Sequence, residues 1–157
     1  MAASFGVVPR DVLLSYDGLG FLRAIVAGEL PMPPIANTLG FTLVEVENGR
    51  AVFAGIPEMR HYNPIGVVHG GFTCTLLDSA LGCAVHSTLA KGEAYTTLEI
   101  KVNLVRAITL ETGKVTADAR IVYRGRTLGT AEAYLKDAAG KLYAHATTTC
   151  MVFPSKA

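Results

Sequence analysis

The longest apolar segment lies in the middle of the chain, between Gly70 and Leu89. Its large and small apolar side chains fall on nearly every face of a helix: Phe72, Leu76, Leu77, Ala80, Leu81, Ala84, Val85 and Leu89. A helix that is apolar all round is buried on most sides. We therefore predict a central helix that the remaining elements enclose.

Elsewhere apolar and polar residues alternate, which is the period of half-buried strands. The predicted strands cover residues 41–47, 50–56, 97–104, 115–123, 131–136 and 142–153. Asn48-Gly49 separates the first two and predicts a tight hairpin. Further turns are expected at 111–113, 124–126 and 137–140.

Ahead of the first strand, apolar residues recur at helical spacing over residues 11–30. Asp17 is the expected N-cap of the second half and Gly28 its stop. The prolines at 31, 33 and 34 predict an extended passage, and residues 1–9 are expected to be frayed. The order αββαββββ predicts an α+β fold, a long helix wrapped by a mostly antiparallel sheet, in a single domain over residues 1–157.

Composition narrows the functional classes. The 157 residues are 50% apolar and 17% charged, and the formal net charge is +1. The charged fraction lies below the ~25% that is usual for globular domains. A near-neutral chain gives no general electrostatic case for nucleic acid or an anionic membrane as a partner. The low charge count predicts that part of the surface is an oligomer interface.

The chain shows no pattern typical of export or of membrane insertion. Residues 79–90 form an uncharged run of 12 residues, whereas a spanning helix needs ~20. The first ten residues lack the cationic start and apolar core of a signal peptide. The three cysteines form no CxxC motif, which argues against a disulfide framework or structural zinc. We expect a cytoplasmic protein.

Asp78 is the candidate reactive group, because it lies within the most apolar helix. Burial of an unpaired carboxylate costs several kcal/mol, and that helix carries no Lys or Arg to pair with it. One interpretation is that Asp78 caps a backbone group or pairs with a distant basic residue. The functional interpretation is that it lines a cleft and acts as a base or nucleophile.

Gly70 and Gly71 open the same helix, directly after His69. Unpaired N–H groups at a helix N-terminus suit a developing oxyanion, although glycine also simply permits a tight turn. Gly70 and Asp78 lie roughly 12 Å apart along the helix axis, whereas reacting atoms must approach within ~3.5 Å. If both serve one reaction, two antiparallel copies of the helix must meet. A two-fold dimer would then carry two equivalent sites.

Other reactive residue types give weaker patterns. Cys74 is predicted to be a core residue. The four histidines show no ligand spacing, so we predict no metal site, and His86 and His145 are expected to be structural. The turn Arg124-Gly125-Arg126 is either a solvated hairpin or a phosphate site, and both interpretations stay open.

Three segments and one further residue together resemble a known family. They are Pro-Pro-Ile-Ala-Asn-Thr-Leu-Gly-Phe (33–41), Asn-Pro-Ile-Gly-Val-Val-His-Gly-Gly (63–71), the helix residue Asp78, and Thr-Thr-Leu-Glu-Ile-Lys-Val-Asn (96–103). The chain resembles the hotdog-fold acyl-CoA thioesterases of the phenylacetic-acid-degradation type over roughly residues 18–153. The resemblance implies hydrolysis of an acyl-CoA or aryl-acyl-CoA thioester to the free acid and CoA, with no cofactor beyond the CoA of the substrate.

The resemblance also implies roles for the matching positions. The Gly70 N–H, assisted by Asn63, would polarise the thioester carbonyl. Asp78 would act as general base on water, or as nucleophile through an anhydride, and Thr97 would position that water. His69 would orient the loop or assist Asn63. In this family the loop faces the Asp and Thr of the other subunit, which implies a homodimer, with pairing into a tetramer left open.

Substrate contacts are expected at both ends of the substrate. The turn at 124–126 lies where such proteins receive the CoA phosphates. The acyl pocket is expected between helix and sheet, bordered by residues such as Met32, Pro34, Tyr62 and Phe72. The residues predicted to contact the substrate are Tyr62, Gly71, Phe72, Arg124, Gly125 and Arg126. The sequence does not select among aryl, short and medium-chain acyl groups.

Two other functions compete with hydrolysis. Hotdog hydratases resemble one another in an Asp-x-Asn-Pro-x-His run, and here the corresponding residues 61–66 lack both the Asp and the His. A non-catalytic acyl-CoA sensor would need a replaced Asp78 or an added DNA-binding segment, and the residues before the first strand hold only Arg10 and Arg23 as basic groups.

Overall fold

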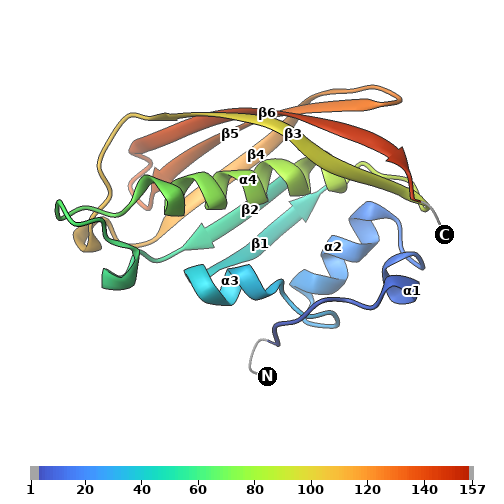
Figure 1. The fold of residues 1–157 in the computed structure, drawn as a ribbon, viewed down its shortest axis with the longest axis horizontal. Coiled ribbons are helices and arrows are strands. Elements are labelled where there is room, and N and C mark those ends of the chain that lie inside the picture. The colour runs from blue at the N-terminus through green and yellow to red at the C-terminus, as the bar shows by residue number, and fades with distance from the viewer. Residues whose placement is uncertain (1–3, 156–157) are drawn as a thin grey trace.

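A computed structural model describes residues 4–155. Its central element is helix α4 (Gly70–His86), around which a six-stranded sheet curves, as Figure 1 shows. The sheet order is β1-β2-β4-β5-β6-β3 and all neighbouring strands are antiparallel. The strands are β1 (Phe41–Glu47), β2 (Arg50–Gly55), β3 (Glu93–Leu104), β4 (Val115–Arg124), β5 (Leu128–Asp137) and β6 (Leu142–Pro154). The predicted helix wrapped by an antiparallel sheet is confirmed.

The core lies between α4 and the inner face of the sheet. The helix contributes large side chains that are fully buried, among them Leu76, Leu77 and Leu81. The facing strands contribute mostly small ones, and each of these alanines is at most 2% exposed: Ala117, Ala119, Ala131, Ala133, Ala144 and Ala146. Because alanine extends little beyond the backbone, the strands can approach the helix closely. The sheet therefore bends around α4 instead of lying flat beside it.

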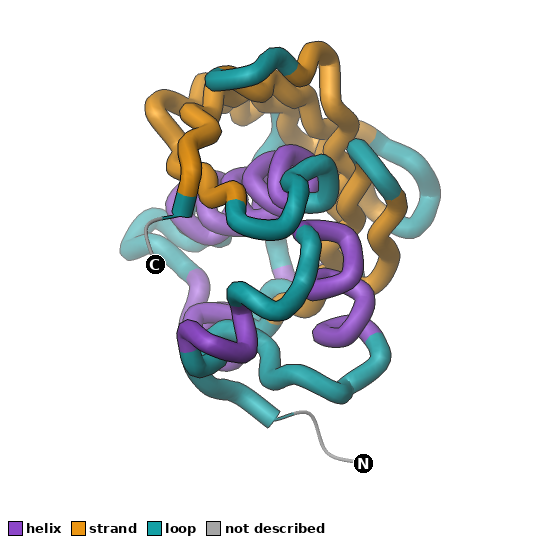
Figure 2. The backbone as a smooth tube through the Cα atoms, turned by 90° about the vertical axis from the view of Figure 1, so that its right-hand side faces the viewer, coloured by secondary structure: helices purple, strands orange, loops and turns teal. Residues whose placement is uncertain are grey.

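The N-terminal layer, defined here as residues 4–39, contains three short helices. They are α1 (Arg10–Leu13), α2 (Gly18–Val26) and α3 (Pro34–Leu39). The predicted cap is confirmed, because the Asp17 carboxylate accepts from the Gly20 N–H at 2.6 Å. Gly28 follows the end of α2 with φ +76°. Figure 2 shows these helices on the opposite side of α4 from most of the sheet.

Two expectations for the N-terminal layer were wrong. Pro34 does not continue an extended passage but starts α3, because the first helical turn needs no donor from that residue and proline's fixed φ suits it. Residues 4–6 are not frayed, since Met32 donates to the Ser4 carbonyl and accepts from the Gly6 N–H, both at 2.9 Å. Residues 1–3 of the predicted frayed segment lie outside the described residues.

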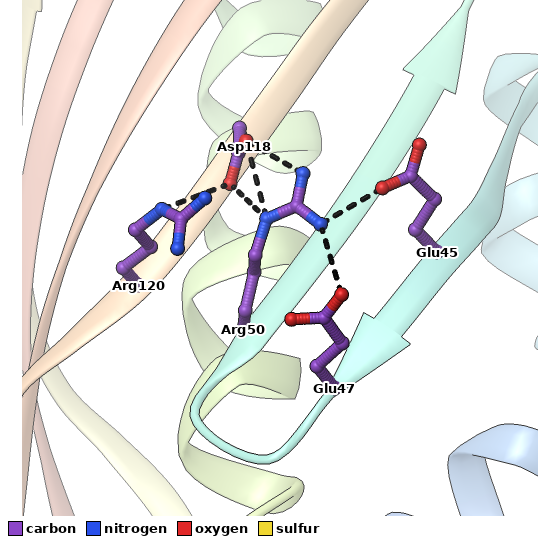
Figure 3. A network of polar contacts seen from close by, with 5 residues as sticks. All are labelled: Glu45, Glu47, Arg50, Asp118 and Arg120. Carbon is purple, nitrogen blue, oxygen red and sulfur yellow. Dashed lines mark hydrogen bonds and ion pairs between the residues drawn. The ribbon is translucent and has the colours of Figure 1, made fainter.

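A charged cluster ties three strands together on the outer face of the sheet (Figure 3). The Arg50 guanidinium on β2 donates to Asp118 on β4 at 2.8 and 3.0 Å and to Glu45 on β1 at 2.8 Å. These contacts raise the pKa of Arg50, chiefly through Asp118. The neighbouring Ala51 and Ala119 are fully buried on the inner face, so the alternation along β2 and β4 separates charge from core.

The two edge strands differ in length. β3 spans 12 residues, Glu93–Leu104, and pairs with β6 on one side only in the part of the chain that is described. Two apolar side chains of β3, Leu98 and Leu104, are each 54% exposed to solvent. A long edge strand with apolar residues is a ready template for pairing with another chain. Within residues 4–155, no helix is long and apolar enough to cross a membrane.

Candidate active site

The loop before α4 is organised by the side chain of Asn63. Its Oδ1 accepts from the backbone N–H groups of Ile65 at 3.1 Å and Val67 at 3.2 Å. The oxygen is thus used inside the loop, and the amide NH₂ is the part of the side chain left to donate outward. The loop thus holds the Asn63 side chain through its Oδ1 and leaves its NH₂ group available to donate to a ligand.

His69 caps α4. Its Nδ1 accepts from the Gly71 N–H at 2.8 Å, so in the neutral ring the proton is on Nε2. This bond takes up the Gly71 donor, whereas no described residue accepts the Gly70 N–H. Gly70 and Asn63 both line a cleft of about 310 Å³ whose other wall includes Leu104. The structure therefore brings two free donors to one cleft.

A side chain at position 70 would intrude on this cleft. A Cβ added to Gly70 would lie 2.8 Å from Cδ1 of Leu104, closer than ordinary van der Waals contact. The two glycines thus serve different purposes. Gly70 lets the backbone approach the cleft. Gly71 lies against the imidazole of His69, because a Cβ added to Gly71 would lie 3.0 Å from Nδ1 of that ring.

Asp78 lies two turns further along α4 and is exposed in the single chain. The Thr97 hydroxyl, on β3, donates to its Oδ1 at 3.4 Å. Among residues 4–155 no Lys, Arg or His forms an ion pair with Asp78, which removes the interpretation that it is a buried structural pair. The register of β3 against β6 shifts between Thr97 and Glu99, and such a bulge re-aims the side chains beside it.

The structure thus divides the predicted catalytic residues into two groups. Asn63 and Gly70 share one cleft, and Asp78 and Thr97 are in contact with each other. Eight residues of α4 separate Gly70 from Asp78, which places the two groups roughly 12 Å apart along the axis. Neither group alone supplies both a base and an oxyanion site.

The predicted substrate-contacting residues lie elsewhere in the single chain. The Tyr62 hydroxyl accepts from the Leu110 N–H at 2.9 Å. Phe72 is 3% exposed and stacks on His61 with ring centroids 4.5 Å apart. Both residues therefore support the loop and the core, and their contact with substrate stays a prediction.

The basic turn is partly neutralised within the chain. Arg124 forms an ion pair with Glu93 at 2.8 Å, donates to Thr88 at 3.1 Å and bonds the Gly125 carbonyl. Arg126 is exposed and lines a separate pocket of about 340 Å³ together with Lys91. Of the two arginines, Arg126 is the one free to meet an anion.

Sequence reasoning missed Tyr95. It lies two residues before Thr97 and so on the same face of β3, and a Cβ added to Gly82 would lie 2.9 Å from its hydroxyl. Gly82 is one turn beyond Asp78 on α4. The strand alternation through Thr97 was the signal that would have placed Tyr95 on the same strand face as Thr97, which contacts Asp78.

Burial keeps the nearby thiols and imidazole uncharged. It raises the pKa of Cys74, and it raises the pKa of Cys83 to about 12. Cys74 is only half-buried and lies outside the hydrophobic core, which differs from the core position predicted for it. Burial lowers the pKa of His86 to about 4. Asp78, by contrast, is exposed on α4.

Comparison with known proteins identifies the family of the chain. The model of the thioesterase superfamily matches residues 65–144, which include the start of α4, Asp78 and Thr97. The chain belongs to the thioesterase superfamily. It is an enzyme that hydrolyses thioester bonds, and the predicted resemblance to hotdog-fold thioesterases of the phenylacetic-acid-degradation type is confirmed.

Individual relatives agree with this membership. The 1,4-dihydroxy-2-naphthoyl-CoA hydrolase of Listeria monocytogenes is 28% identical, with 69% of this chain and 86% of the relative covered. The crystal structure of a phenylacetic acid degradation-related protein from Ralstonia eutropha is 31% identical, with a TM-score of 0.75 over 83% of this thioesterase and 98% of the relative. A thioesterase family protein from Silicibacter pomeroyi is 28% identical, with a TM-score of 0.74 over 85% and 98%.

Proposed function

We propose that this thioesterase hydrolyses acyl-CoA thioesters at sites shared between two subunits. The observation that carries the proposal is the division of the site: free donors at Asn63 and Gly70, and an unpaired carboxylate at Asp78 held by Thr97. Each group lacks what the other has, and the roughly 12 Å between them exceeds the reach of one reacting centre.

The open edge of β3 supplies a way to join the two groups. Two-fold pairing of β3 with β3 of a second copy would extend the sheet and set the two α4 helices antiparallel. The N-terminus of each α4 would then approach the middle of the other. Burial of exposed Leu98 and Leu104 at this edge favours such pairing. A homodimer is the smallest unit that completes a site.

The proposed reaction needs only groups present in the chain. The thioester carbonyl oxygen accepts from the Gly70 N–H and the Asn63 amide, and Asp78 of the partner subunit takes a proton from the attacking water. The tetrahedral oxyanion collapses, the C–S bond breaks, and the CoA sulfur leaves with the electron pair and takes up a proton. Thr97 holds the carboxylate in position, and His69 fixes the loop through its cap. Attack by Asp78 itself, through an anhydride, uses the same geometry.

We further propose that the CoA phosphates bind at the basic turn at 124–126. Arg126 and Lys91 are exposed cations beside one pocket. Arg124 is held by Glu93, so its contribution is to shape the turn with Gly125. Phosphate contacts by surface cations are weakened by salt, and KM for acyl-CoA is expected to rise with ionic strength.

Thiol release from a panel of acyl-CoA substrates tests the proposed function. We expect Asp78→Asn to lower kcat by about 10²–10⁴-fold, the range of a general base. Glu132→Gln, an exposed carboxylate on β5, is the matched control and should leave kcat unchanged. A wild-type protein that gains thermal stability with acyl-CoA but releases no thiol would indicate a sensor instead. Full turnover in Asp78→Asn would remove that residue from the mechanism.

A further inference from the structure

A third cavity lies between the N-terminal layer and α4. Its volume is about 360 Å³, within the range of small-molecule pockets. Its walls come from α1, α2, the passage through Met32 and Pro34, strands β1 and β2, and Cys83 and His86 on α4. Leu13, Phe21, Ile25, Leu43 and Phe53 supply most of the apolar surface. Of the four residues that the sequence predicted to border an acyl pocket, Met32 and Pro34 line this cavity, whereas Tyr62 and Phe72 do not.

The cavity carries no charge at neutral pH. None of its described lining residues is Lys, Arg, Asp or Glu. The two side chains with titratable atoms, Cys83 and His86, are both held neutral by burial, as described above. A phosphate or carboxylate would lose its hydration there without gaining a partner. The cavity suits an uncharged, apolar group.

The N-terminal layer, which covers the cavity, is attached to α4 by a hydrogen bond and by close packing. The Gly18 N–H at the start of α2 donates to the Leu89 carbonyl at 2.9 Å, just beyond the end of α4. A Cβ added to Gly18 would lie 1.8 Å from the His86 carbonyl oxygen, so α2 lies directly against the helix terminus. Residues 4–6 are held by Met32 on the other side. The pocket is thus already formed in the free chain.

A row of aromatic side chains extends from this cavity to the strand that carries Thr97, the residue in contact with Asp78. Tyr95 lies on the face of β3 that carries Thr97, and its ring centroid is 5.4 Å from that of His86. His86 in turn stacks on Phe21 of α2 at 5.3 Å. Along α4, His86 lies eight residues beyond Asp78, or roughly 12 Å. This separation is one that a long acyl group spans from a carbonyl at Asp78, whereas an acetyl group is too short to span it.

We propose that this cavity binds the distal part of the acyl group, which makes the enzyme selective for apolar acyl chains of medium length. The inference rests on the proposed function, because it places the thioester at Asp78. In an acyl-CoA the phosphates are charged and the pantetheine arm carries amide groups that need hydrogen-bond partners. The acyl chain is the portion without either, so it is the portion that suits this apolar cavity. At ~30 Å³ for a group of the size of water, the volume accommodates about a dozen heavy atoms.

The test compares kcat/KM for decanoyl-CoA with kcat/KM for acetyl-CoA in the full-length protein. Ile25→Asp places a charge in the cavity from α2, and Leu13→Asp does so from α1. Both variants should lower the decanoyl-to-acetyl ratio at least tenfold, since a single methylene in an apolar pocket is worth about 10-fold or more. Val26→Asp is the matched control: Val26 is the next residue on α2, is 43% exposed and does not line the cavity. It should leave the ratio unchanged.

A second measurement separates this inference from the proposed function. The uncharged probe 1-decanol should raise the Tm of the wild type and of Val26→Asp, and should not raise that of Ile25→Asp. If no acyl-CoA releases thiol but decanol stabilises the protein in this pattern, the proposed function fails and the pocket stands. A ratio that stays unchanged in both cavity variants, or a wild type without a decanol shift, overturns the inference.

Discussion

Complementation between two inactive variants tests the shared site directly. Asn63→Asp keeps the oxygen that accepts from Ile65 and Val67, so the loop retains its shape. It replaces the outward NH₂ donor with a carboxylate oxygen, which repels a developing oxyanion. Asp78→Asn removes the base and leaves the Thr97 contact sterically intact. Each variant alone should be nearly inactive.

The expected recovery follows from the geometry. In a two-fold dimer each site takes Asn63 from one subunit and Asp78 from the other. A mixed dimer of the two variants therefore has one site with both defects and one site with none. Random mixing of equal amounts gives mixed dimers in about half of the pairs, so about a quarter of wild-type activity should return.

The assay is thiol release after the two variants are unfolded together, refolded and compared with each variant refolded alone. A mixture of Asp78→Asn with Thr97→Val is the control, because both changes fall in the same half-site and no intact site can form. If the Asn63→Asp mixture is no more active than the sum of its components, while the dimer forms, both halves of the site lie in one chain and the distance argument is wrong.

Three further results are expected. Thr97→Val should lower kcat about tenfold, the lower end for a hydrogen bond to a charged group, and Thr97→Ser should restore it; equal loss in both would show a packing effect. The pKa of His86 in the folded protein, about 4, lies below its value in the unfolded chain. The free energy of unfolding should therefore fall as the pH drops from 6.5 towards 4, by up to about 3 kcal/mol. In measurements of Tm against pH, the wild type should show this decline and His86→Phe should not. Arg50→Lys removes the two-point hydrogen bonding to Asp118 on a partly exposed face. The free energy of unfolding should fall by about 1 kcal/mol and Tm by about 2–4 °C. A Tm equal to that of the wild type would show that the charged cluster adds nothing to stability.

The pattern of apolar and polar residues predicted the positions of the main helices and strands, because that pattern repeats regularly within each of them. The predicted segment 41–47 coincides with β1, and Asn48-Gly49 forms its hairpin with β2. Proline was less informative, because its effect depends on position within a turn: Pro34 begins a helix, whereas the sequence indicated an extended passage. The charge cluster around Arg50 joins three strands, and no local pattern reveals which strands become neighbours.

The candidate site was only half accessible to sequence reasoning. Helix geometry separates Gly70 from Asp78 without any structure. The contact between Asp78 and Thr97, by contrast, depends on where β3 packs. The pairing of Arg124 with Glu93 spans 31 residues, so the sequence alone could not show that one cation of the basic turn is already engaged.

The alanines that face α4 have a consequence for how the chain orders on folding. Alanine has no side-chain rotamers to lose when it is buried, whereas each leucine gives up about 0.5–1 kcal/mol of conformational freedom. The six alanines on the inner face of β4, β5 and β6 thus become ordered at no side-chain entropic cost, whereas Val115, Leu135 and the leucines of α4 are the fully buried side chains that lose rotamers. The strands thus present mostly small side chains to α4, and the helix presents mostly large ones to the sheet. Core variation should consequently be tolerated on the helix, through exchanges of similar volume, and resisted on the strands, where any added methyl group pushes backbone away from backbone.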